Sequence, residues 1–195
     1  MKLKRNATLA ALFLLLYLRA SSPAFADTGA STIPDSVKQF AGDTFPLMPA
    51  DLEGIPNADR AYLKGLFSLI LESANARLTL TNAMSVGQSG LVDPFVLKTR
   101  QLKLKFLELT DSGAAAQLKG DVPAVLDIQA KVLKRAADTK QPLSDCVKSP
   151  ELLEAQTRIS GMWNLLQNKY SGMSPEVKAA MQQYLNLLDM RRLGR

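Results

Sequence analysis

Apolar residues recur at helical spacing along most of the chain. On one side of a 3.6-residue period, between residues 57 and 86, lie Leu63, Leu66, Ile70, Ala74, Leu78 and Met84. Further apolar positions at this spacing follow around residues 97–107, 122–136 and 155–165. No stretch alternates apolar and polar residues between hairpin turns, as a strand would. The pattern predicts an all-α fold.

Capping residues and prolines mark the expected helix starts. Asn57 is placed to cap a long first helix that ends near Val86, before Gly87 and Gly90. Later starts are marked by Asp93-Pro94, Asp121 with Pro123, Ser149-Pro150-Glu151 and Ser174-Pro175-Glu176. The second helix should end at residues 111–113, and the third before Pro142.

These segments, with a short helix around residues 35–40, predict a single bundle of about five to six helices. No repeat of 30 to 50 residues recurs, so a solenoid is not expected. Residues 27–56 are rich in Pro, Gly, Ser, Thr and Asp, which predicts an extended lead-in. The helical domain is expected to cover residues 57–195.

Residues 1–26 have the three parts of a signal peptide. MKLKR is basic, Leu9 to Leu18 is apolar, and Ala24-Phe25-Ala26 has the small-x-small pattern of a cleavage site. The apolar part is shorter than the roughly 20 residues that span a bilayer. We therefore expect a cleaved leader and a periplasmic or secreted protein without a stable membrane anchor. A buried N-terminal helix is the alternative.

Removing the leader changes the charge balance. The chain has a net charge of +6, and four of its basic residues lie in the leader with no acidic one, so the mature part carries +2. The nearest basic cluster is Lys98, Arg100, Lys103 and Lys105, whose spacing scatters them around a helix. This favours a solvated face, and no nucleic-acid partner is expected.

Cysteine and histidine usage limits the chemistry. Cys146 is the only cysteine, so it cannot form an intrachain disulfide, and we expect it to be buried. The chain has no histidine, which excludes histidine-based catalytic triads and argues against zinc and haem sites. No metal and no other cofactor are expected.

Several polar side chains share the apolar faces. They are Arg77 and Gln88 on the first helix, Arg100 on the second, Gln129 on the third and Arg158 on the fourth. An arginine can lay its stem along apolar surface and lift its head to water. A buried guanidinium stays charged, however, and is costly without a partner. Together, with Glu72 as the one inward carboxylate candidate, these residues indicate an anionic ligand.

The second helix also places an arginine among apolar residues. Arg100 lies between Leu97, Leu104 and Leu107 at helical spacing. Arg100 is therefore expected to point into the bundle interior.

The spacing of these arginines resembles that of the all-helical chorismate mutases, in particular their exported branch. That family places an arginine in the first helix, a lysine eleven residues later and a second arginine twelve residues after that, next to a glutamate. Arg77 and Arg100 fall at the two arginine positions, and ARLTL around Arg77 is similar to the family's first-helix pattern. Arg158 falls where exported members supply a further arginine. The order of helices is similar over most of residues 57–192.

The chain departs from the family at several positions. Gln88 stands where the family has its lysine, and Gln101 where it has the glutamate. The polar positions of the third helix fall near Leu133 and Ala137, with Gln129 or Thr139 as substitutes in a shifted register. A single cysteine cannot form the disulfide that exported members often have near their end.

The resemblance implies a cofactor-free rearrangement of chorismate to prephenate in the bundle interior. It implies catalytic roles for Arg77, Gln88 and Arg100, and substrate-binding roles for Gln101, Gln129 and Arg158. Its ligand would be a small dicarboxylate, because arginines bind carboxylates in a two-pronged manner. Loss of a preorganised charge at a developing anion, as at Gln88, costs about 100- to 1000-fold in rate.

The alternative is a non-enzymatic helical binding protein outside the cytoplasm, such as an adaptor, an inhibitor or an immunity-type partner. The changes at Gln88 and Gln101 are what a fold freed from catalysis would tolerate. Its ligand would be a protein, with the basic tail Arg191, Arg192 and Arg195 as one docking candidate, and a homodimer is also open.

The two hypotheses differ in what they require of the interior. An enzyme needs Arg77, Gln88 and Arg100 to converge on one polar pocket, whereas a binding protein pairs Arg77 internally.

Overall fold

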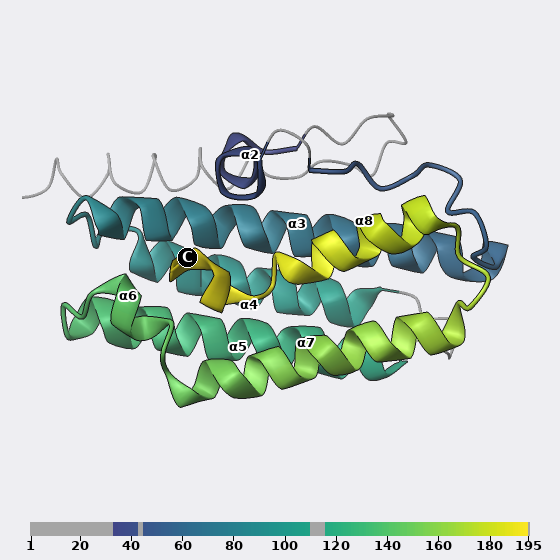
Figure 1. The fold of residues 1–195 in the computed structure, drawn as a ribbon. Coiled ribbons are helices and arrows are strands. Elements are labelled where there is room, and N and C mark those ends of the chain that lie inside the picture. The colour runs from purple at the N-terminus through teal and green to yellow at the C-terminus, as the bar shows by residue number, and fades with distance from the viewer. Residues whose placement is uncertain (1–32, 43–44, 110–115, 195) are drawn as a thin grey trace, which may run out of the picture. The chain divides into compact units, whose positions relative to one another are not determined.

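The computed structural model describes residues 33–42, 45–109 and 116–194. The helices in these ranges are α2 (Asp35–Ala41), α3 (Asn57–Ser85), α4 (Val92–Glu108), α5 (Ala116–Asp138), α6 (Leu143–Cys146), α7 (Pro150–Lys169), α8 (Pro175–Asn186) and the 3-10 helix η1 (Met190–Gly194) (Figure 1). No strand occurs in the described ranges, so the all-α fold class is confirmed. The predicted signal peptide, residues 1–26, lies outside them.

Five long helices pack in a closed order. α3 packs on α4, α4 on α5, α5 on α7, α7 on α8, and α8 returns to α3. Figure 1 shows α3, α4, α5 and α7 running alongside one another, with the short α2 crossing α3. The expected single bundle of about five to six helices is confirmed for the described residues.

Several helix starts follow the sequence signals. α7 and α8 begin at Pro150 and Pro175, as predicted. The Ser174 side chain accepts a hydrogen bond from the backbone N–H of Val177 at 3.3 Å, which caps α8. α3 begins at Asn57 without a side-chain cap, because Pro56 takes the N-cap position.

The start of α5 was predicted wrongly, because this helix begins at Ala116 and contains Pro123. A proline lacks the N–H group that a helix interior uses and crowds the preceding turn, so it normally marks a start. Here Leu118 and Val122 are both fully buried. Extending the helix upstream of Pro123 brings Leu118 into the core, and this packing overrides the local signal.

One further boundary differs from the prediction, and two short helices were not predicted. α4 ends at Glu108 rather than at residues 111–113, all of which lie outside the described residues. The short helices α6 and η1 had no marked sequence signal.

In the described part of the lead-in, α2 is the short helix expected near residues 35–40, and residues 45–56 contain no helix. Phe45, Leu52 and Ile55 are buried in the same apolar cluster as the long helices. The peptide N–H of Ser174 donates to the carbonyl of Glu53 at 3.3 Å, which ties this segment to the start of α8. Residues 45–56 therefore belong to the packed domain.

A polar cluster joins the start of α3 to the end of α7. The Tyr170 hydroxyl donates to Asp59 at 2.9 Å, and the Lys169 ammonium lies 3.0 Å from the same carboxylate. Burial and then the bond to Asp59 raise the pKa of the Tyr170 hydroxyl. Because Asp59 is buried, these two partners offset part of the cost of removing its carboxylate from water.

The backbone of Gly54 has no room for a side chain. Its φ is +80°, and a Cβ atom there would lie 1.9 Å from the carbonyl oxygen of Gly172. Gly161 is different, because a Cβ atom in this helical position of α7 would meet nothing within 4 Å.

We expect Gly54→Ala to destabilise the fold by about 2 kcal/mol or more, through backbone strain and overlap. Gly161→Ala is the control and should raise stability by about 0.5–1 kcal/mol, since alanine favours a helix interior. Urea unfolding of both variants measures this. Equal midpoints for the two variants would contradict the described approach of the two backbones.

Candidate functional site

Arg77 points into the bundle, as expected, and is bonded by protein groups. Its side chain is 1% exposed. Nη1 donates to Gln129 Oε1 at 3.0 Å, and Nη2 donates to the carbonyl of Leu187. Gln129 is also buried, and its amide nitrogen donates to the carbonyl of Leu188. A connected set of hydrogen bonds thus joins α3 and α5 to the backbone that directly follows α8.

The acceptors around Arg77 are neutral. Burial lowers the pKa of Arg77 to about 10, and the carboxylate of Asp189 opposes this shift. The guanidinium therefore remains charged at neutral pH. Its Nε atom has no acceptor among the described residues.

The bonded carbonyls explain why polar groups are placed here. α8 ends at Asn186, and the last carbonyls of a helix have no partner within it. Leu187 and Leu188 follow directly and are buried, so water cannot take this role. Arg77 and Gln129 supply the missing donors. Arg77 thus has a structural function, which the sequence analysis had considered only under the binding-protein alternative.

The expected inward placement of Arg100 is wrong. The buried residues of α4 are Val92, Phe95, Thr99, Leu102 and Phe106. They repeat at steps of three and four, a continuous seam that carries two phenylalanines. Arg100 and Gln101 lie on the opposite side of the helix and are exposed.

Gln88 lies apart from both Arg77 and Arg100. It is exposed in the segment after α3, and it lines a hollow of about 660 Å³ together with Met84, Gln141 and Leu143. Neither Arg77 nor Arg100 lines this hollow. The three residues expected to be catalytic therefore do not converge on one pocket.

Arg158 is half-buried and bonded to carboxylates of the protein. Its guanidinium lies 3.0 Å from Asp121 on α5 and 3.0 Å from Glu154 on its own helix. It thus joins α7 to α5. Of the expected site residues, only Arg77 and Gln129 are brought together.

Glu72 does not pair with Arg77. It forms ion pairs with Lys98 and with Lys105, the latter at 3.5 Å, both on α4. Lys103 of α4 pairs in the same way with Asp127 of α5. These pairs lie along the two borders of α4.

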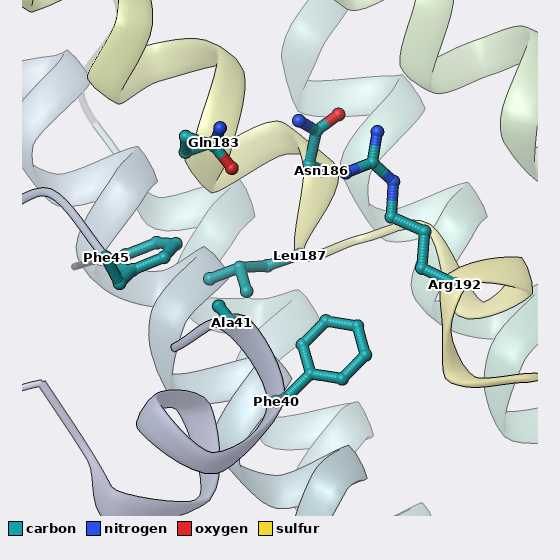
Figure 2. A pocket seen from close by; sticks show the side chains of 7 residues that line it. All are labelled: Phe40, Ala41, Phe45, Gln183, Asn186, Leu187 and Arg192. Carbon is teal, nitrogen blue, oxygen red and sulfur yellow. The ribbon is translucent and has the colours of Figure 1, made fainter. Parts of the chain in front are cut away.

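A smaller hollow of about 250 Å³ lies between α2 and the end of α8 (Figure 2). The rings of Phe40 and Phe45 form its apolar walls, and Leu187 lies between them in this view. Gln183, Asn186 and Arg192 supply its polar rim. It is smaller than the roughly 300–1,000 Å³ of most ligand pockets, and Arg192 already lies 3.8 Å from Asp189.

The side of α4 that faces away from the bundle carries large apolar side chains. We call this side the α4 outer face, and it consists of Leu97, Arg100, Gln101, Leu104, Leu107 and Glu108. The three leucines are 56%, 61% and 56% exposed. Leu97, Leu104 and Leu107 were expected in the core, on the same side of the helix as Arg100. α4 has a second row of apolar residues, with Phe95, Leu102 and Phe106, and it is this row that packs in the core.

Three other features were considered as functional sites: the basic tail, Cys146 and clusters of metal-binding side chains. Arg191 donates to Gln156 at 2.8 Å, and Arg195 of the basic tail lies outside the described residues. Cys146 is buried, as expected, and its thiol contacts the carbonyl of Pro142 at 3.2 Å. Within the described ranges, no three carboxylate or thiol groups are gathered as a metal ion would require.

A comparison with protein-family models gave no match, and searches of curated proteins and of solved structures gave none either. Of the helices described, none has the length and hydropathy needed to cross a membrane. The helices of the described residues define the class of this protein as an all-α helical bundle.

We expect Arg77→Met to destabilise the fold by about 2–4 kcal/mol. Methionine keeps most of the volume but leaves Gln129 and the Leu187 carbonyl without their donor. Arg100→Met removes the same groups from an exposed site and should change stability by less than about 0.5 kcal/mol.

Urea unfolding of both variants measures the difference. An unfolding free energy for Arg77→Met equal to that of Arg100→Met would show that the buried hydrogen bonds contribute nothing.

Proposed function

We propose that the chain is a non-enzymatic helical binding protein that acts outside the cytoplasm, with the α4 outer face as its binding surface. The observation that carries this proposal is the row of three leucines on that face, each more than half exposed. Large apolar side chains lined up on one side of a surface helix favour a partner that covers them.

The distribution of exposed apolar residues supports this choice of surface. Seven large hydrophobic side chains are exposed in the described ranges, and four of them, Leu91, Leu97, Leu104 and Leu107, belong to α4 or its N-cap. Single exposed leucines elsewhere need no explanation, but a row on one helix face does.

The border of the face has the composition of an interface rim. The leucines are flanked by Arg100, Gln101 and Glu108 on α4, and the ion pairs of Lys98 and Lys103 lie beside them. An apolar centre with a polar rim is the usual anatomy of a protein interface.

The bonding of the arginines favours binding over catalysis. Arg77 donates to a glutamine and a carbonyl, and Arg158 is held by two carboxylates. A dicarboxylate substrate would have to displace these protein groups. The rearrangement of chorismate that the family resemblance implies is therefore the weaker proposal.

A photoreactive amino acid placed at position 104 tests the binding surface in cells that export the protein. We expect it to cross-link the chain to a protein partner. The same group at position 153 is the control, because Leu153 is 57% exposed but lies on α7. Cross-linking at position 153 that equals that at 104 would contradict a role of the α4 outer face.

The rearrangement of chorismate is tested directly with the purified protein lacking residues 1–26. We expect no turnover above the uncatalysed rate, and none for Gln88→Lys, because position 88 is exposed beside a hollow that Arg77 and Arg100 do not line. Loss of chorismate absorbance measures the rate. Turnover that Arg77→Met or Arg100→Met abolishes would overturn the proposed function in favour of the enzyme.

A further inference from the structure

We infer that the α4 outer face binds the same face of a second copy of this chain, with the two α4 helices antiparallel and Leu104 near the two-fold axis. This inference rests on the proposed function, because it names the partner of the surface proposed there. It follows from how charge is arranged around Leu104.

Arg100 and Glu108 lie symmetrically about Leu104, four residues before it and four after it. Both are exposed, and neither forms an ion pair with another described residue. They are eight residues apart, about 12 Å along the helix axis, so they cannot pair well within one chain. Each is therefore available to an opposite charge on a partner.

A two-fold axis at Leu104 brings these charges together. It reverses the second helix, so that Arg100 of one copy lies at the same height as Glu108 of the other. The same contact is repeated at the other end of the interface, which is what an isologous interface requires. A parallel arrangement would instead place Arg100 beside Arg100 and Glu108 beside Glu108.

The apolar residues fit the same arrangement. Leu104 of one copy meets Leu104 of the other at the centre. Leu107 faces the stem of Gln101 on either side, and Leu97 extends the apolar row toward the start of α4. Covering the three leucines removes apolar surface from water, which supplies the main driving force.

Other partners fit the charges less well. An acidic helix or an anionic bilayer would attract Arg100 but place Glu108 against negative charge. The lysines at the borders of α4 do not reverse this, because Lys98 and Lys105 are paired with Glu72, and Lys103 with Asp127. Only a partner that carries both signs in reverse order matches the face, and a second copy does so by symmetry.

The size of the contact sets the expected affinity. One helix face with its borders buries less than the roughly 1,600 Å² of a standard interface, and contacts below about 1,200 Å² are typical of weak complexes. We therefore expect a monomer–dimer equilibrium with a dissociation constant in the micromolar range or above. A dimer should form at high concentration and dissociate on dilution.

Analytical ultracentrifugation of the protein without residues 1–26, over about 1 µM to 1 mM, tests the inference through a charge exchange. The unmodified protein should dimerise with concentration. Arg100→Glu and Glu108→Arg should each weaken the dimer at least tenfold, because each places like charges together twice. The double variant Arg100→Glu/Glu108→Arg should restore dimerisation, because the reversed charges pair again.

The leucine at the centre is tested with a matched pair. Leu104→Lys should abolish the dimer, whereas Leu153→Lys, an equally exposed leucine on α7, should leave it intact. Urea unfolding of all variants shows that each remains folded, since all four positions are on the surface.

Three results would overturn the inference: a monomer at every concentration, a double variant as weak as the single ones, or dimers lost equally through Leu153→Lys. A monomer that still cross-links at position 104 to a different protein would refute the second copy as partner and leave the proposed function standing. A monomer without a cross-link at position 104 would refute both.

Discussion

The bundle depends on the hydrogen bonds between Arg77, Gln129 and the carbonyls that follow α8. These carbonyls are buried, and buried backbone acceptors without donors are costly. Two side chains from α3 and α5 supply the donors, and this lets the chain turn inward after Asn186. The apolar core is divided at this level. Leu78 and Leu126 belong to one cluster, whereas Leu80 and Ala130, a few residues further on, belong to the other. The hydrogen bonds of Arg77 and Gln129 therefore fix the position of the end of α8 relative to α3 and α5.

The inward direction of Arg77 and Gln129 was predictable, but their partners were not. A 3.6-residue period places both residues among buried apolar positions, which the structure confirms. Their acceptors are main-chain carbonyls 110 and 59 residues away along the chain. A carbonyl is present at every residue, so nothing in the sequence distinguishes the two that receive these bonds. Because Glu72 was the one inward carboxylate candidate, a ligand was inferred where Gln129 and a backbone carbonyl of the protein accept the hydrogen bonds of Arg77.

The helices, too, could be predicted where local interactions decide and not where tertiary packing decides. Starts such as Ser174-Pro175 were predicted correctly because the cap acts within one turn, and Ser174 bonds the N–H of Val177. Pro123 misled because the burial of Leu118, a tertiary effect, outweighs it. On α4 two rows of apolar residues compete, and only packing against α3 and α5 decides between them. The row with Phe95 and Phe106 became the core, and Arg100 was thereby placed outside.

The leucines on the α4 outer face are not needed for packing, because the other side of α4 already forms its contacts with the bundle. α4 packs on α3 and α5, and both of its borders are closed by ion pairs to Glu72 and Asp127. The fold therefore needs nothing from Leu97, Leu104 or Leu107, and exposed leucines lower solubility without adding to the core. Polar residues at these positions would serve the helix as well. A row of leucines that the fold does not use is best explained by a contact outside the fold, whereas both terminal nitrogens of the buried arginine donate to groups within it.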